Sequence, residues 1–155
     1  MRRDPRVKKN ELDYDINDFQ TLVSRTSNAY KRATSQYVDL INFWNDLGER
    51  HFSGQISFEI DEQNALVSGN ASGKRFSIYS SMHYRGNEAL LEARVAVNDP
   101  VANSEKIVGR FLVSQTGSIH ASDGELVLHV DDDLRQYKTL AAVVRRVFGI
   151  THQGE

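Results

Sequence analysis

The chain has 155 residues, no cysteine, two prolines, 19 basic and 21 acidic side chains, and 39% hydrophobic residues. The lack of cysteine excludes a disulfide scaffold and a zinc ribbon, and a net charge of −2 argues against a domain built to neutralise phosphates. Its apolar runs are too short to cross a membrane. We therefore expect one globular domain, cytoplasmic and without a membrane segment.

The beginning of the chain separates charge sharply. Residues 1–10 carry five basic side chains against one acidic one, and residues 11–20 carry four acidic side chains and no basic one. Because no apolar periodicity runs through residues 1–13, we expect a flexible basic arm there. A solvated terminus is the simplest interpretation, and contact with nucleic acid or an acidic partner through this arm is the alternative.

A long amphipathic helix is predicted over residues 16–47, where no proline or glycine interrupts the chain. Asp15 or Asn17 can cap its start, and Gly48 stands where helices commonly end. Two rows of residues repeat every seven positions, which is the a and d pattern of a heptad. These rows are Ile16, Val23, Tyr30, Tyr37 and Trp44, and Phe19, Thr26, Ala33, Leu40 and Leu47.

After Gly54 the apolar period falls to two, which is typical of strands with one buried face. We expect strands over 56–60, 65–68, 76–84, 91–97, 107–114, 119–121 and 126–130, with residues 69–73 as a loop. Short turns such as Asp123-Gly124 favour antiparallel neighbours. The pattern therefore predicts an antiparallel meander of six to seven strands, as a curved sheet or a partly closed barrel.

The chain closes with a second predicted helix, over residues 134–148. Asp131, Asp132 and Asp133 precede it, where acidic side chains cap free N–H groups, and Gly149 ends it. The fold class is therefore α+β: a long N-terminal helix, the meander and a C-terminal helix. We expect one domain over residues 14–150, between the arm at 1–13 and a tail at 151–155. The element order resembles both a cystatin-like roll and a pleckstrin-type barrel.

The predicted helix is longer than the predicted sheet is wide. Thirty-two residues span about 48 Å, whereas six strands span about 25–30 Å. Part of the apolar stripe must then meet something other than the sheet, and the simplest partner is a second copy of the helix. We expect Val23, Tyr30, Tyr37 and Trp44 to form the contact, because bulky aromatic residues suit a wide interface.

Two of the five histidines have a serine two positions on, in His51-Phe52-Ser53 and His120-Ala121-Ser122. Paired His-x-Ser motifs resemble those of two-histidine phosphoesterases. That resemblance implies one imidazole as general base, the other as general acid, and the hydroxyls of Ser53 and Ser122 on the phosphate. The chain departs from that family's pattern because Arg50 precedes His51 where an apolar strand residue is expected.

We therefore expect a non-enzymatic protein-binding domain that forms a homodimer through the long helix, such as an adaptor, inhibitor, chaperone or immunity-type factor. No cofactor and no metal site are expected, because no histidine pair stands at i,i+4 and no oxygen-ligand spacing follows the aspartates. The alternative is a small-molecule or nucleotide-binding pocket between sheet and helices. In that reading the protein is a phosphoesterase that uses His51, Ser53, His120 and Ser122.

Overall fold

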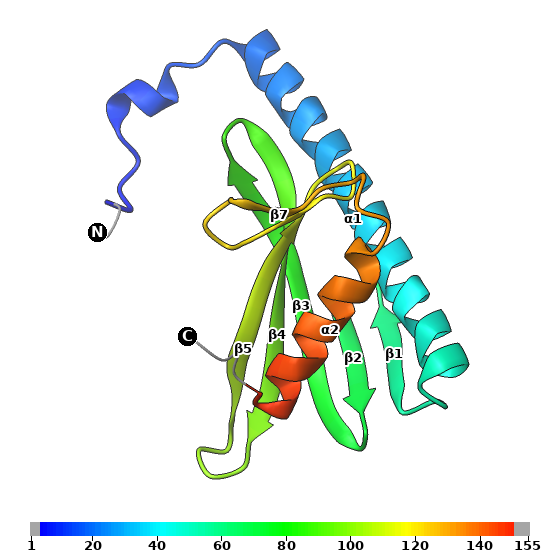
Figure 1. Ribbon diagram of the computed structural model, residues 1–155. Coiled ribbons are helices and arrows are strands. Elements are labelled where there is room, and N and C mark those ends of the chain that lie inside the picture. The colour runs from blue at the N-terminus through cyan, green and yellow to red at the C-terminus, as the bar shows by residue number, and fades with distance from the viewer. Residues whose placement is uncertain (1–3, 151–155) are drawn as a thin grey trace.

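The computed structural model describes residues 4–150, and its element order confirms the predicted α+β fold (Figure 1). A 3-10 turn, η1, precedes the long helix α1, seven strands follow, and α2 comes last. Their bounds are η1 Lys9–Leu12, α1 Ile16–His51, β1 Ile56–Asp61, β2 Leu66–Ala71, β3 Lys74–Arg85, β4 Glu88–Asp99, β5 Ser104–Val113, β6 Ile119–His120, β7 Leu126–Leu128 and α2 Arg135–Phe148.

The strands form one antiparallel sheet in sequence order, from β1 to β7, which curls into a half-barrel. β3 and β4 are the longest strands and pair from Phe76 with Val97 to Arg85 with Glu88. Both helices pack on the same face of the sheet, because side chains from α1, α2 and six strands belong to one buried cluster. The molecule therefore has a single core, between the sheet and its two helices.

Alternation along the strands produces this core. On β4, Leu91, Ala93 and Val95 are buried on the face toward the helices. Leu91 pairs with Val113 on β5, so the apolar rows of neighbouring strands come into register. The intervening Glu92 and Arg94 lie on the opposite face, as the period of two requires.

The second half of α1 is fixed to the sheet by two contacts. The Trp44 ring is fully buried, 5.2 Å from the Phe58 ring between centroids, and its Nε1–H donates to the Gln136 carbonyl of α2 at 2.9 Å. The Asn45 side chain binds the backbone of edge strand β1: its Oδ1 accepts from Phe58 N–H at 2.7 Å and its Nδ2 donates to Phe58 O at 3.0 Å. Asn45 thus pairs with the β1 edge as a neighbouring strand would.

Several predicted bounds differ from those of the structure, and two of the differences lie at glycines. Gly48 does not end α1, which continues to His51. A Cβ at Gly48 would lie 2.1 Å from the Ile56 carbonyl oxygen, so glycine is needed there because β1 crosses the helix closely. Residues 69–73 are not all loop, since β2 runs to Ala71. Gly69 lies beneath the Phe76 ring, where a Cβ would come within 2.3 Å of the ring.

The acidic residues before α2 do not cap the helix in the predicted way. α2 begins at Arg135, and Leu134, its N-cap, makes no side-chain capping bond. Asp132 instead accepts from the Leu134 N–H at 2.9 Å and from Lys138 Nζ at 2.9 Å. Asp15 does cap α1 as expected, because its Oδ1 accepts from the N–H groups of Asn17 and Asp18.

Ahead of α1, residues 4–14 are exposed along their whole length. The predicted arm therefore contains one turn of 3-10 helix, η1, and packs against no part of the core. The first three residues of the arm and the predicted tail at 151–155 lie outside the described residues.

Candidate functional site

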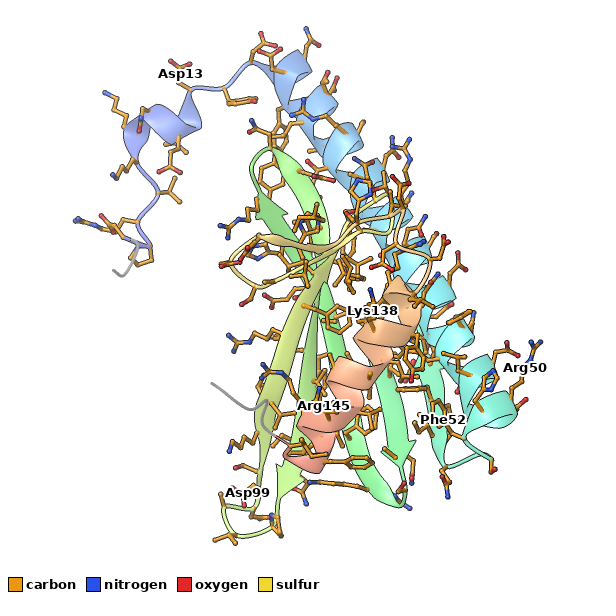
Figure 2. The ribbon with its side chains drawn as sticks, in the orientation of Figure 1. Asp13, Arg50, Phe52, Asp99, Lys138 and Arg145 are labelled. Carbon is orange, nitrogen blue, oxygen red and sulfur yellow. The ribbon has the colours of Figure 1, made fainter. Side chains whose placement is uncertain are left out.

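The long helix runs past the end of the sheet. Arg32 Nη1 donates to Gln115 Oε1 at 3.1 Å, and Gln115 Nε2 donates to Glu88 Oε1 at 3.5 Å. Glu88 is the first residue of β4, so the sheet ends close to the level of Arg32. No residue from Ile16 to Asn28 is buried, and we call this segment the projecting end (Figures 1 and 2).

Large apolar side chains are exposed on the projecting end. Ile16 is 70% exposed, Phe19 53% and Val23 47%. They occupy successive a and d positions and continue the same helix face that is buried farther along at Ala33 and Tyr37. These three residues, the exposed stripe, show that the core-facing side of α1 extends beyond the core.

The four residues predicted to contact a partner are divided between these two environments. Val23 lies in the exposed stripe and Tyr30 is half-buried beside the core. Tyr37 and Trp44 are 4% and 0% exposed, since their rings pack against the chain's own sheet. This corrects the predicted surface: in this fold a partner can reach Val23 and part of Tyr30, but not Tyr37 or Trp44.

Two residues of the exposed stripe were not among the predicted contacts, although both stand in the heptad rows. The predicted contact rests on the a positions and their bulky aromatic residues, and so it does not include Ile16 or Phe19. A signal was available in the chain order. The connection from His51 to Ile56 is short, so the last turns of α1 must lie on the sheet and the surplus length must be at its N-terminus.

The projecting end carries opposite charges at its two ends. Asp18 and the preceding Asp13 and Asp15 cluster at its start. The basic residue Arg25 lies about two turns after Asp18, and Lys31, just past the segment, lies about three and a half turns after it. All five are exposed. The segment is therefore an apolar stripe with a negative and a positive end.

The phosphoesterase reading needs His51 and His120 to meet, and the structure gives no support for this. His51 is the last residue of α1, next to β1, while His120 lies on β6, five strands away in the sheet order. The cleft that His120 lines contains neither His51 nor the serine of either motif. Ser53 and Ser122 are both exposed.

His120 is held in place by hydrogen bonds on both ring nitrogens. Nδ1 lies 3.2 Å from the Gly124 carbonyl, which can only accept, so Nδ1 carries the hydrogen. Nε2 then accepts from Ser118 Oγ at 3.0 Å in the neutral ring, and Ser118 Oγ is 2.6 Å from Ser114 Oγ. Because these partners are buried or half-buried, the network fixes the β5–β6 turn and commits the imidazole to it.

Within residues 4–150 there is no group of three or more histidine, aspartate or glutamate side chains placed to hold a metal ion. Over the same residues, neither helix has a stretch apolar enough to span a bilayer.

Comparisons with protein-family models, with curated proteins and with solved structures give no match, so the projecting end is interpreted from its own geometry.

Proposed function

We propose that this chain is a non-enzymatic protein-binding domain that self-associates through the exposed stripe of α1. One observation carries the proposal: the face of α1 that forms the core farther along remains apolar and uncovered from Ile16 to Val23. Exposed apolar residues that form a continuous patch mark interaction sites more often than scattered ones do. A second copy supplies a surface of the same kind and length.

The heptad positions favour an antiparallel pair. In such a pair a positions of one helix pack against d positions of the other. Phe19 of one copy then lies level with Val23 of its partner, and Ile16 lies level with Thr26, so the two-fold axis passes near residue 21. The contact is isologous and closes on itself, which yields a dimer rather than a filament.

Charge complementarity supports the same orientation. With the axis near residue 21, the acidic start of one projecting end lies level with the basic part of the other, so Asp18 is level with Arg25 along the helix axis. A parallel pair would place the three aspartates of each copy together. Like charges in contact are unfavourable, so the charges select the antiparallel arrangement.

The proposal is tested by sedimentation velocity over a series of concentrations, from about 10 to about 300 μM, because the contact is shorter than a standard interface. We expect the wild type to shift from monomer to dimer across this range. Phe19→Asp places a charge in the apolar contact and should raise the dissociation constant at least about tenfold.

Phe43 provides a matched control. It is also an exposed phenylalanine of α1, at 39% exposure, but it lies outside the heptad rows on the buried half. Phe43→Asp should leave the dissociation constant unchanged. A wild type that stays monomeric at the highest concentration, or equal effects of the two substitutions, would contradict the proposal.

A further inference from the structure

A cleft of about 300 Å³ lies between α2 and the edge of the sheet, and we call it the α2 cleft. Its walls come from four strands and one helix face. Six apolar side chains form most of them: Val95, Phe111, Ile119, Val127, Leu128 and Val143. Pockets that bind small organic molecules begin at about this volume and have mainly apolar walls with a few polar groups.

The charged residues that line the α2 cleft are all basic. They are Arg110, Lys138 and Arg146, and no carboxylate lines the cleft. Arg110 pairs with Arg94 in the sheet, so its side chain starts on the face away from the helices, whereas Lys138 and Arg146 come from α2. A groove of about 510 Å³ along α1 shows the reverse, because Asp39, Asp61 and Glu62 line it without any basic side chain. In a chain of net charge −2, an apolar cleft whose wall has basic but no acidic residues favours an anionic ligand.

Arg146 is the best placed of the three cations. Its side chain crosses β5 at Gly109, where a Cβ would lie 3.0 Å from Arg146 Cδ, and its Nη1 donates to the Val108 carbonyl at 3.0 Å. This bond fixes the guanidinium at the mouth of the cleft and leaves further N–H donors free for a ligand. Within residues 4–150, no carboxylate lies within ion-pair distance of Arg146 or of Arg110.

The other polar groups of the cleft are already engaged. Lys138 Nζ is paired with Asp132 at 2.9 Å, and His120 makes the two hydrogen bonds described above. Lys138 and His120 therefore have fewer free donors to bind a ligand than Arg146 has. A fixed arginine fork binds a carboxylate through two parallel hydrogen bonds, which a lysine cannot do.

We infer that the α2 cleft binds a small apolar monocarboxylic acid. The apolar part of the acid occupies the space between Phe111 and Val143, and the carboxylate binds Arg146 at the mouth. This site is separate from the projecting end of α1, and ligand binding there does not involve the dimer contact.

Calorimetric titration with octanoate tests this inference on the full chain. We expect octanoate to bind with a dissociation constant below about 1 mM, and octanamide and octylammonium to bind at least about tenfold more weakly. Arg146→Gln should weaken octanoate binding by at least about tenfold. Arg145→Gln, at an exposed neighbour on α2 that does not line the cleft, should not change it (Figure 2).

A second variant tests the position of the apolar part. Ala142 lines the cleft from an exposed position on α2, so Ala142→Phe should fill the mouth and abolish binding while the thermal unfolding temperature stays close to the wild-type value. The inference is overturned if octanoate does not bind, if octylammonium binds equally well, or if Arg146→Gln and Ala142→Phe both leave binding unchanged.

Discussion

The two halves of α1 share one heptad pattern and have opposite environments. From Ala29 to Gly48 the a and d rows are buried or half-buried against the sheet, whereas from Ile16 to Val23 the same rows are exposed. The sequence pattern does not change between them. Periodicity therefore defines which face of a helix is apolar, whereas the extent of the opposing sheet decides how much of that face becomes core.

The largest difference between the halves should appear in folding stability. Trp44→Ala removes a fully buried ring and its hydrogen bond to Gln136, so it should lower the free energy of unfolding by about 3–5 kcal/mol. Phe19→Ala removes an exposed ring, and its effect should stay within about 0.5 kcal/mol. Urea denaturation of dilute protein measures both. Similar losses for the two variants would mean that the projecting end also belongs to the core.

A smaller effect is expected from the contact between Asn45 and the β1 edge. Asn45→Ala leaves the N–H and the carbonyl of Phe58 without their partner, which should cost about 1–3 kcal/mol of unfolding free energy. Asn42, exposed one turn earlier on α1, is the matched control and should change stability by less than about 0.5 kcal/mol when replaced by alanine. Equal losses would show that Asn45 does not fix this half of the helix.

Tyr37 lies within the buried half and allows a finer test. Its hydroxyl is buried without a hydrogen-bond partner among the described residues, so Tyr37→Phe should leave the stability unchanged or raise it by up to about 1 kcal/mol. Burial, with a smaller contribution from Tyr30, raises the pKa of Tyr37 well above its ordinary value of 10.0. The folded state therefore retains this proton longer than the unfolded chain.

It follows that the contribution of Tyr37 to stability is fully present below pH 10 and is lost as the pH rises above it. Ultraviolet titration should show one tyrosine of the wild type that stays protonated after the others have ionised, and Tyr37→Phe should remove that signal. A loss of more than about 1 kcal/mol in the variant would instead reveal a partner for the hydroxyl.

The smallest expected effect is at Asp132, just before α2. This is the helix whose Gln136 carbonyl accepts the hydrogen bond from Trp44. The hydrogen bond from Lys138 and that from the Leu134 N–H lower the pKa of Asp132 below 3.8. Its contribution to stability is therefore present above pH 3.8 and is lost as the pH falls through the lowered pKa. Lys138→Met should raise the pKa of Asp132 in an NMR titration, whereas an unchanged value would exclude Lys138 as the main cause.

Most of the fold followed from the sequence because its elements are strongly periodic. The heptads over residues 16–47 and the alternation along β4 each indicate one apolar face, and the structure confirms the helix and the strand that they predict. The boundaries at Gly48 and Gly69 were predicted wrongly, because each glycine is required by a close contact with another element. Gly48 lies against Ile56 and Gly69 against Phe76. No local pattern reports such contacts.

The candidate site was predictable in part. Length arithmetic indicated that α1 exceeds the sheet, but the choice of Tyr37 and Trp44 as contacts relied on their size. The pairing of Asn45 with β1 determines where the helix sits on the sheet, and this depends on tertiary structure. The α2 cleft could not be predicted from the sequence, since Arg146 and the apolar residues of four strands come together only after folding.

The antiparallel dimer is tested by a distance between its two copies, measured by pulsed electron spin resonance. The chain has no cysteine, so Lys31→Cys provides one spin-label site, exposed and outside the heptad rows. With the two-fold axis near residue 21, the two labels are separated by about 30 Å in the antiparallel dimer. A separation near 10 Å, which is the spacing of parallel helices, would contradict the antiparallel dimer. The absence of any dipolar signal between two copies would contradict it as well.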